Sequence, residues 1–238
     1  MSNIIILGDV HLGAGSQYGK VGIGAKLNSK ILDQFELLDW VLEKAIDSLS
    51  NDIIITGDVF EEPKPHYSLI TMFAAWLNRC ASHYINVHII IGNHDILRVG
   101  NLYSSPLDII NEMSLQNVHL YKDISTTYIN DVAVTLMPFR DRKSLSASSI
   151  QEAVAILGNN LYYELSSIPS IQRKIIIGHF AIEGSIPVGY EIDDLSNEIF
   201  CPLDMFSGYD YVWMGHIHKP QVLQTKNPYI AHIGSMDI

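Results

Sequence analysis

The side chains best suited to bind metal ions occur in five short motifs, each of which directly follows an apolar run. The motifs are GDVH at 8–11, GDVF at 57–60, GNHD at 92–95, GHF at 178–180 and GHIH at 215–218. Their carboxylates, imidazoles and amide are ligands for ions such as Mn²⁺, Zn²⁺ or iron. Such a set can hold two ions, provided that one carboxylate bridges them.

The spacing within the motifs supports this interpretation. The pairs Asp9/His11 and His216/His218 are two residues apart, so an extended backbone points both members to the same side. Glycine precedes candidates such as Asp58, Asn93, His179 and His216. Glycine lets the backbone turn sharply and approach a metal or phosphate. A single GD or GH dipeptide is usually only a turn, but five motifs in this order favour a site.

Five predicted strands must position these motifs. Short β-branched runs predict strands at 3–7, 53–56, 87–91, 174–177 and 211–214, each ending just before a motif. Open α/β sheets place their sites at such strand ends. Apolar residues at helical spacing predict helices at 29–49, with Ser29 as the cap, and at 68–81, 106–112 and 147–165.

The remaining predicted strands indicate antiparallel pairing. Runs at 118–121, 126–129 and 132–137 are so closely spaced that they predict a meander, and further strands are expected at 221–224 and 229–233. Crossover helices and hairpins together predict an α/β fold, a two-sheet mixed β-sandwich flanked by helices in α-β-β-α layers. With 238 residues and no shift in composition, the chain is expected to form one domain over 1–238.

The overall composition limits the function classes. The formal net charge is −11, which argues against binding nucleic acid through a broad basic surface. Two divalent ions would still attract a phosphate locally. No apolar run approaches the roughly 20 residues of a membrane span, so a soluble cytoplasmic protein is expected. Cys80 and Cys201 are expected to be free thiols.

Three other features have weaker interpretations. The stretch at 13–26 lacks the spacing of a phosphate-binding loop and is interpreted as a mobile loop near the site. The basic residues Arg140, Arg142 and Lys143 stand beside an aspartate, which favours a solvated surface but leaves nucleic-acid contact open. The remaining histidines lack a motif and are expected at the surface or in the core; they are His66, His83, His88, His119 and His232.

The five motifs together resemble those of the calcineurin-like metallophosphoesterase superfamily, from Asp9 to Ser235. The segments GDVFEEPKP and GNHD differ from the GDxVDRG and GNHE of its protein phosphatases, and His94 differs from the GNRD of lipid A pathway hydrolases. The segments DYVWMGHIHKPQ at 210–221 and YIAHIGS at 229–235 are similar to the SbcD and meiotic-recombination nuclease branch.

This resemblance implies a role for each candidate residue. One divalent ion would be held by Asp9, His11 and His218, the other by Asn93, His179 and His216, with Asp58 bridging them. The ions are expected to be Mn²⁺, with Zn²⁺, Fe²⁺ and Mg²⁺ as alternatives. A water activated by both ions would attack phosphorus. His94 would then stabilise the transition state or protonate the leaving 3′ oxygen, with Asp95 fixing its orientation.

The resemblance also implies a substrate and partners. It predicts a DNA exonuclease or endonuclease that works with an SbcC-type ATPase, and a homodimer is a further expectation. Many relatives have His or Asp where Glu61 stands, which leaves the balance of the two activities open. Relatives continue after the position of Ser235 into a capping domain and ATPase-binding helices, and these regions are expected to be absent from this chain. The alternatives are a phosphodiesterase acting on cyclic nucleotides or other small phosphoesters, and a non-enzymatic scaffold.

Overall fold

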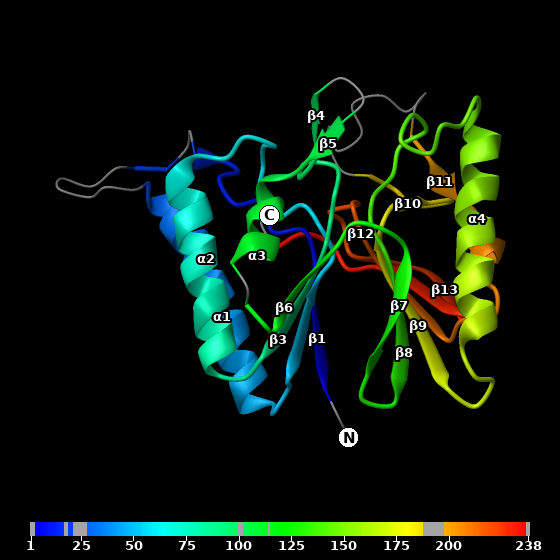
Figure 1. The fold of residues 1–238 in the computed structure, drawn as a ribbon, viewed down its shortest axis with the longest axis horizontal. Coiled ribbons are helices and arrows are strands. Elements are labelled where there is room, and N and C mark those ends of the chain that lie inside the picture. Colours follow the sequence, from blue (N-terminus) through cyan, green and yellow to red (C-terminus); the bar gives the residue numbers. More distant parts are fainter. Residues whose placement is uncertain are drawn as a thin grey trace. The chain divides into compact units, whose positions relative to one another are not determined.

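The computed structural model describes residues 3–16, 19–20, 28–99, 102–113, 115–187 and 198–236. The chain divides into two compact units (Figure 1). Unit 1 comprises the residues up to Leu120 together with the segment at Met236, and unit 2 comprises Tyr121–Ser235. Each unit has its own sheet and its own apolar core. The prediction of a single domain over 1–238 stays a prediction.

The sheet of unit 1 delivers the first three motifs. Its strands are β1 (Ile4–Leu7), β2 (Asp52–Ile55), β3 (Asn86–Ile90) and β6 (Val118–Tyr121), in the order β1-β2-β3-β6. β2 pairs in parallel with both β1 and β3. Because parallel strands end at the same edge of a sheet, the loops that follow β1, β2 and β3 lie at one edge.

Two helices, α1 (Ser29–Asp47) and α2 (Tyr67–Ser82), pack against this sheet (Figure 1). Residues such as Leu38 of α1 and Trp76 of α2 are fully buried in the same cluster as Ile53 and Val87 of the strands. The Trp76 indole N–H donates to the carbonyl oxygen of Leu38 at 2.9 Å. The face of the sheet that the helices cover is removed from water, which explains why the strands consist of apolar runs.

The N-terminus of α1 corrects one prediction. Asn28, rather than Ser29, is the capping residue, because its side-chain oxygen accepts from the backbone N–H of Lys30 at 2.9 Å. Asparagine and serine cap helices about equally well, so the sequence offered both. His66 caps α2 in the same way, accepting from the Ser68 N–H at 3.2 Å.

Short elements complete unit 1. The strands β4 (Leu97–Val99) and β5 (Leu102–Ser104) form an antiparallel hairpin directly after the GNHD motif. A 3₁₀ turn, η2 (Pro106–Asp108), leads into α3 (Ile109–Glu112), in agreement with the helix expected at 106–112. Ser105 and Asp108 form a capping box at its start.

The sheet of unit 2 delivers the last two motifs. Its strand order is β13-β14-β12-β9-β8-β7, with the bounds β7 (Ser125–Ile129), β8 (Val132–Met137), β9 (Arg173–His179), β12 (Tyr211–Gly215), β13 (Gln221–Thr225) and β14 (Tyr229–His232). The pairs β8/β9, β9/β12 and β12/β14 are parallel, whereas β7/β8 and β13/β14 are antiparallel. The sheet is therefore mixed.

The helix α4 (Ile150–Ser167) packs on the sheet of unit 2 (Figure 1). Its residues Leu157 and Leu161 share a buried cluster with Ile176 and Val212 of the strands. A two-stranded parallel sheet, β10 (Ala181–Ile182) with β11 (Phe200–Cys201), and the 3₁₀ turn η3 (Leu203–Phe206) complete the unit.

The predicted meander at 118–137 is wrong. β7 and β8 form the expected hairpin, but β6 belongs to the other sheet, where it lies beside β3. The Val87 N–H donates to the carbonyl oxygen of Asn117 at 2.8 Å, and Val118 packs in the core of unit 1. Close spacing along the chain predicts neighbouring strands but cannot tell when the chain passes to another sheet. The predicted α/β class, with mixed sheets and flanking helices, is confirmed.

Candidate metal centre

The first two motifs are joined by backbone hydrogen bonds at the edge of the sheet of unit 1. The N–H groups of Val10 and His11 both donate to the carbonyl oxygen of Asp58, at 3.0 and 2.8 Å. The Leu12 N–H donates to the Val59 carbonyl oxygen at 2.9 Å. The loop after β1 and the loop after β2 therefore form one rigid piece.

The backbone is held in an unusual conformation at two of the predicted ligands in this piece. His11 and Asp58 both have φ of 49°, in the left-handed region that most side chains avoid. Gly57, immediately before Asp58, has φ of 112°, which only glycine adopts easily. Such conformations persist where the surrounding structure fixes them, and they are concentrated at functional sites.

Three side chains of unit 1 converge well enough to bind a metal ion. One donor atom each of His11, Asp58 and His94 lie within 4.8 Å of one another. Nε2 of His11 is 3.7 Å from Oδ2 of Asp58, and the backbone N–H of His94 donates to Oδ1 of Asp58 at 2.8 Å. His11 and Asp58 are buried, 3% and 1% exposed. A buried carboxylate beside imidazoles fits a divalent cation, because the cation offsets the cost of burying the charge.

Glu61 contacts both candidate histidines of unit 1, His11 and His94. Its carboxylate oxygen Oε2 is 2.8 Å from Nδ1 of His11, and its main-chain carbonyl oxygen is 2.7 Å from Nδ1 of His94. Since a carbonyl oxygen only accepts, Nδ1 of His94 carries the hydrogen. From the sequence, Glu61 was notable only as a departure from relatives. No local pattern indicates that it contacts His11, 50 residues away in the chain.

The charges of unit 1 favour protonation of His11 in the absence of metal. Burial alone would lower its pKa, but the hydrogen bond that His11 donates to Glu61 and the negative charge of Asp58 outweigh burial and raise the pKa of His11 to about 9. The same hydrogen bond lowers the pKa of Glu61. A divalent ion at this site would replace that proton.

Asp95 is fully buried, and its carboxylate binds the backbone of two motifs. Oδ1 accepts from the N–H groups of Val59 and Phe60 at 3.0 and 3.3 Å, and Oδ2 accepts from the Gly92 N–H at 3.0 Å. Asp95 thus ties the GDVF loop to the GNHD loop. Its predicted role in orienting His94 stays a prediction.

The other unit 1 candidates lie in the same loops. Asp9 is fully buried, and its carboxylate accepts from the Thr56 hydroxyl at 3.4 Å. Asn93 is partly buried and begins the turn that contains His94. Gln34 of α1 was missed by the sequence reasoning, although it binds the loop after Asp9. Its amide donates to the His11 carbonyl oxygen at 3.1 Å, and its side-chain oxygen accepts from the Gly13 N–H at 2.9 Å.

A sequence signal for Gln34 did exist. It lies one helical turn before Leu38, on the apolar face of α1, where a polar residue is unexpected. Gln34 is only 1% exposed, so its amide must find partners inside the protein. A buried polar side chain on the apolar face of a helix is thus a usable indicator of a structured loop nearby.

In unit 2, two predicted ligands meet at the ends of adjacent strands. β9 and β12 are parallel with Gly215 opposite His179, so His179 and His216 reach the same edge. Their ring centroids are 5.1 Å apart, and both side chains are buried. His216 has φ of 78°, again in the left-handed region. The ring of Phe139 lies 6.2 and 6.0 Å from the two imidazoles.

Two further residues of unit 2 contribute to this cluster. Glu198 was not singled out from the sequence, and its Oε1 is 3.3 Å from Nε2 of His216. His232 was expected at the surface or in the core; it is in the core, 2% exposed, with Nδ1 donating to the Gly215 carbonyl oxygen at 3.1 Å. Burial lowers the pKa of His232 to about 4, and the nearby His216 and His179 add to this effect.

His218 is partly buried and follows β12 by three residues. Its carbonyl oxygen accepts from the Ser235 N–H at 3.1 Å. Gly234, with φ of 90°, passes so close that a Cβ there would lie 2.8 Å from this oxygen. The segment GHIH is therefore held by the YIAHIGS segment that the sequence singled out.

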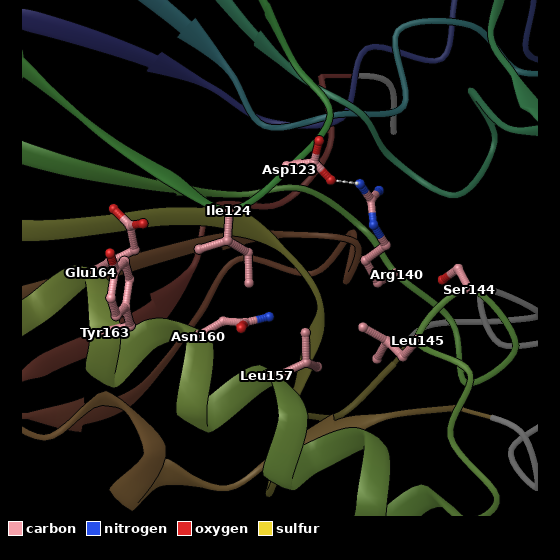
Figure 2. A pocket seen from close by; sticks show the side chains of 9 residues that line it. All are labelled: Asp123, Ile124, Arg140, Ser144, Leu145, Leu157, Asn160, Tyr163 and Glu164. Atoms are coloured by element: carbon pink, nitrogen blue, oxygen red, sulfur yellow. Dashed lines mark hydrogen bonds and ion pairs between the residues drawn. The ribbon is translucent and has the colours of Figure 1, made fainter.

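Unit 2 also contains a cavity of about 400 Å³, shown in Figure 2. Asn160, Tyr163 and Glu164 of α4 line it together with Ile124 and Arg140. Arg140 donates to Asp123 Oδ1 at 2.7 Å, and Figure 2 shows its guanidinium turned toward that carboxylate. Arg140 is therefore already paired with an acidic residue. Contact of the predicted basic cluster with nucleic acid stays a prediction.

The remaining minor predictions have mixed outcomes. His88 is buried and pairs with Asp52 at 3.2 Å, whereas His66, His83 and His119 are exposed, as expected. Both cysteines are free and buried. Much of the loop predicted at 13–26 lies outside the described residues. In the part of the chain that is described, no helix is both long and apolar enough to cross a bilayer.

Sequence comparisons agree with this geometry. A family model described as calcineurin-like phosphoesterase matches residues 2–220. The chain is similar to the DNA double-strand break repair protein Mre11 of Methanopyrus kandleri, at 26% identity over 89% of this chain and 43% of the relative. It is also similar to the protein of the same name from Aeropyrum pernix, at 23% identity over 100% of this chain and 54% of the relative. The chain thus spans about half the length of these curated relatives.

Solved structures support the fold alone. The chain resembles a dimetal phosphatase from Danio rerio with a TM-score of 0.58 and 11% identity, covering 98% of this chain and 87% of the other. It also resembles phosphopantetheinyl hydrolase from Mycobacterium tuberculosis, with a TM-score of 0.51 and 14% identity, covering 98% and 90%. At these identities the likeness concerns architecture rather than substrate.

Proposed function

Because the chain belongs to the calcineurin-like phosphoesterase family, we propose that it is a metal-dependent DNA nuclease of the Mre11 and SbcD type. The observation that carries this proposal is the convergence of His11 and Asp58, two assigned ligands, with His94 beside them, in loops tied to one another in unit 1. The similarity to proteins named for DNA double-strand break repair supports DNA as the substrate. The family supplies the reaction class, hydrolysis of a phosphoester.

The donor set fits two divalent ions. Following the order of the family motifs, we assign one ion to Asp9, His11 and His218, the other to Asn93, His179 and His216, and the bridge to Asp58. Carboxylates with imidazoles suit Mn²⁺, Zn²⁺ or Fe²⁺, and we propose Mn²⁺. When bound, two such cations lower the pKa of water and neutralise charge developing on the phosphate oxygens.

His94 is proposed to handle the proton of the leaving group. The Glu61 carbonyl oxygen holds the hydrogen of Nδ1, which leaves Nε2 as the nitrogen that can exchange a proton with a substrate. In its imidazolium form His94 would donate from Nε2 to the leaving 3′ oxygen, and the backbone bond to Asp58 would keep the ring in place. His94 therefore acts on the substrate rather than as an obligatory ligand.

The decisive experiment compares His94→Asn with the wild type and with His83→Asn, an exposed histidine at the end of α2. We expect the wild type with Mn²⁺ to degrade linear DNA and His94→Asn to lose about 10²–10⁴-fold in turnover. Mn²⁺ affinity, measured by calorimetry, should be unchanged in both variants. Inactivity of the wild type on blunt, single-stranded and hairpin DNA would contradict the proposal.

One observation favours a second candidate, a phosphodiesterase for cyclic nucleotides or other small phosphoesters. The net charge of −11 disfavours a long polyanionic substrate and does not hinder a small one. The same assay panel therefore includes cyclic nucleotides. Turnover of these with none of DNA would replace the nuclease by this alternative, and no turnover with any divalent metal would favour a scaffold.

The cellular context is proposed on the same basis. The resemblance suggests assembly with an SbcC-type ATPase, a homodimer and a location in the cytoplasm. These properties belong to whole proteins, whereas this chain matches 43–54% of two such relatives. Copurification with the ATPase and measurement of the molar mass in solution would test the two assemblies.

A further inference from the structure

We propose that Glu61 is a positioning residue that sets the orientation and tautomer of His11 for metal binding. This inference rests on the proposed role of His11 as a metal ligand. Glu61 is neither one of the assigned metal ligands nor one of the proposed catalytic residues. In the structure it nevertheless contacts His11, an assigned ligand, and His94, a proposed catalytic residue.

The first step concerns which nitrogen of His11 faces which neighbour. Nδ1 lies 2.8 Å from Oε2 of Glu61, and Nε2 lies 3.7 Å from Oδ2 of Asp58. An ionised carboxylate only accepts hydrogen bonds, so Nδ1 carries the hydrogen. In a neutral ring the lone pair is then on Nε2, on the side of Asp58. The imidazole is thus presented to a cation through Nε2.

The second step concerns why His11 needs such a partner. Metal-binding histidines generally donate their other ring N–H to a carboxylate or carbonyl, which fixes the ring and raises its basicity. His11 is 3% exposed, so a water molecule cannot easily accept the hydrogen bond from its second ring N–H. The side chain of Glu61 is 41% exposed, so its carboxylate remains partly hydrated and its negative charge is not costly to keep.

The third step concerns how the position of Glu61 is fixed. Its backbone N–H donates to the Leu12 carbonyl oxygen at 3.2 Å, which continues the ladder that joins the GDVH and GDVF loops. Its carbonyl oxygen holds His94 at 2.7 Å. The Glu61 side chain therefore starts from a backbone that is tied to both histidines, and replacing the side chain leaves the contact with His94 available.

The test uses Glu61→Ala, Glu61→Gln and, as a matched control, Glu62→Ala, which removes an equal charge from the next, exposed residue. Mn²⁺ binding is measured by calorimetry. We expect Glu61→Ala to lose about 10–100-fold in affinity. Glu61→Gln retains an oxygen that can accept from Nδ1 and should recover most of the loss, and Glu62→Ala should change little. Glu61→Gln is also the variant least disturbing to folding.

A second readout reports on the ring itself. In protein with ¹⁵N-labelled histidine loaded with Zn²⁺, the wild type and Glu61→Gln should show His11 bound through Nε2 with hydrogen on Nδ1. Glu61→Ala should show a mixture of the two nitrogens. A spectrum of Glu61→Ala identical to the wild type, or equal losses of affinity in Glu61→Ala and Glu62→Ala, would overturn the positioning role.

Two other outcomes separate this inference from the function on which it rests. If the wild type binds no Mn²⁺, the proposed function fails first. If it binds Mn²⁺ and a crystal structure with Mn²⁺ shows the Glu61 carboxylate coordinated to the ion, Glu61 is a ligand and the positioning role is wrong while the metal centre stands. Neither outcome depends on whether DNA is the substrate.

Discussion

Two buried histidines, His11 in unit 1 and His232 in unit 2, respond to burial in opposite ways. They are 3% and 2% exposed, yet the pKa of His11 is raised to about 9 and that of His232 is lowered to about 4. His11 faces carboxylates, whereas His232 faces a carbonyl oxygen and two other imidazoles. Burial penalises the charged form of both imidazoles, so the charge of the neighbouring groups decides whether the pKa is raised or lowered.

This difference extends to the candidate ligands of each unit. The unit 1 loops carry Asp9, Asp58 and Glu61, while the predicted ligands of unit 2 are all imidazoles. In the described part of unit 2, Glu198 is the carboxylate that contacts His216. The candidate residues of unit 1 thus carry most of the negative charge, whereas those of unit 2 are neutral donors when their imidazoles are unprotonated.

The largest expected effect comes from Gly92→Ala, which should break the unit 1 cluster. A Cβ at residue 92 would overlap both the carboxylate and the backbone nitrogen of Asp58. The backbone cannot move away because it belongs to the joined loops. We expect a loss of more than about 3 kcal/mol in the free energy of unfolding, beyond ordinary overpacking, together with loss of Mn²⁺ binding. Urea denaturation and calorimetry measure the two effects.

Gly178→Ala is the matching change in unit 2. Its Cβ would lie 2.8 Å from Sδ of Met214 and 2.9 Å from Cβ and the carbonyl oxygen of Met137. These distances are longer than those from a Cβ at residue 92 to Asp58, and the side chain of Met214 can move, so the loss should be smaller, about 1–3 kcal/mol. If Gly178→Ala lowers the free energy of unfolding more than Gly92→Ala does, the expectation that the contact with Asp58 is the tighter of the two is wrong.

An intermediate effect is expected from pH. The raised pKa of His11 stabilises the metal-free protein below pH 6.5, and this contribution is lost as the pH rises through about 9. The lowered pKa of His232 has the opposite pH dependence. Its contribution to the free energy of unfolding is present above pH 6.5 and is lost as the pH falls through about 4. Each amounts to about 3 kcal/mol.

Urea denaturation in EDTA between pH 4 and 10 measures how the free energy of unfolding falls at alkaline pH (the alkaline limb) and at acid pH (the acid limb). The variant His11→Gln should flatten the alkaline limb and leave the acid limb unchanged. The variant His232→Gln should flatten the acid limb and leave the alkaline limb unchanged. Adding Mn²⁺ should remove the alkaline limb as well, because a bound ion excludes the proton from His11. If one variant flattened both limbs, the environments of His11 and His232 would not be independent of each other.

The smallest expected effect is that of Gly158→Ala in α4, away from both histidines. A Cβ there meets only Cγ of Met205, at 4.0 Å, which is ordinary contact. Replacing a glycine within a helix by alanine should raise the free energy of unfolding by about 0.5–1 kcal/mol. The shift should be equal at every pH. A pH-dependent shift would show that α4 is coupled to one of the histidine environments.

The positions of the candidate motifs at strand ends were more predictable than the contacts around them. Buried parallel strands read as continuous Ile and Val runs, so strands such as β3 and β12 were located within a residue or two, and with them the motifs that follow. The glycine before Asn93 was expected to permit close approach. The structure gives the reason, since Gly92 lies against Asp58.

What could not be predicted are contacts that join distant parts of the chain. Glu61 contacts His11 and Gln34 contacts Gly13 although the partners are far apart in the chain. No periodic pattern in the sequence predicts either contact. The move of β6 to the sheet of unit 1 is similar, because strand propensity does not specify a partner. Sequence patterns thus located the candidate ligands, while the hydrogen bonds that hold their loops required coordinates.

The left-handed backbone at His11, Asp58 and His216 has a consequence for how ions enter and leave. The energetic cost of these conformations is met when the chain folds, by the core and the backbone ladder, so capture of an ion need not supply it. Chelation should therefore empty the ligands without dismantling the loops. The protein could then exchange one divalent ion for another as the supply varies, with the same scaffold receiving each in turn.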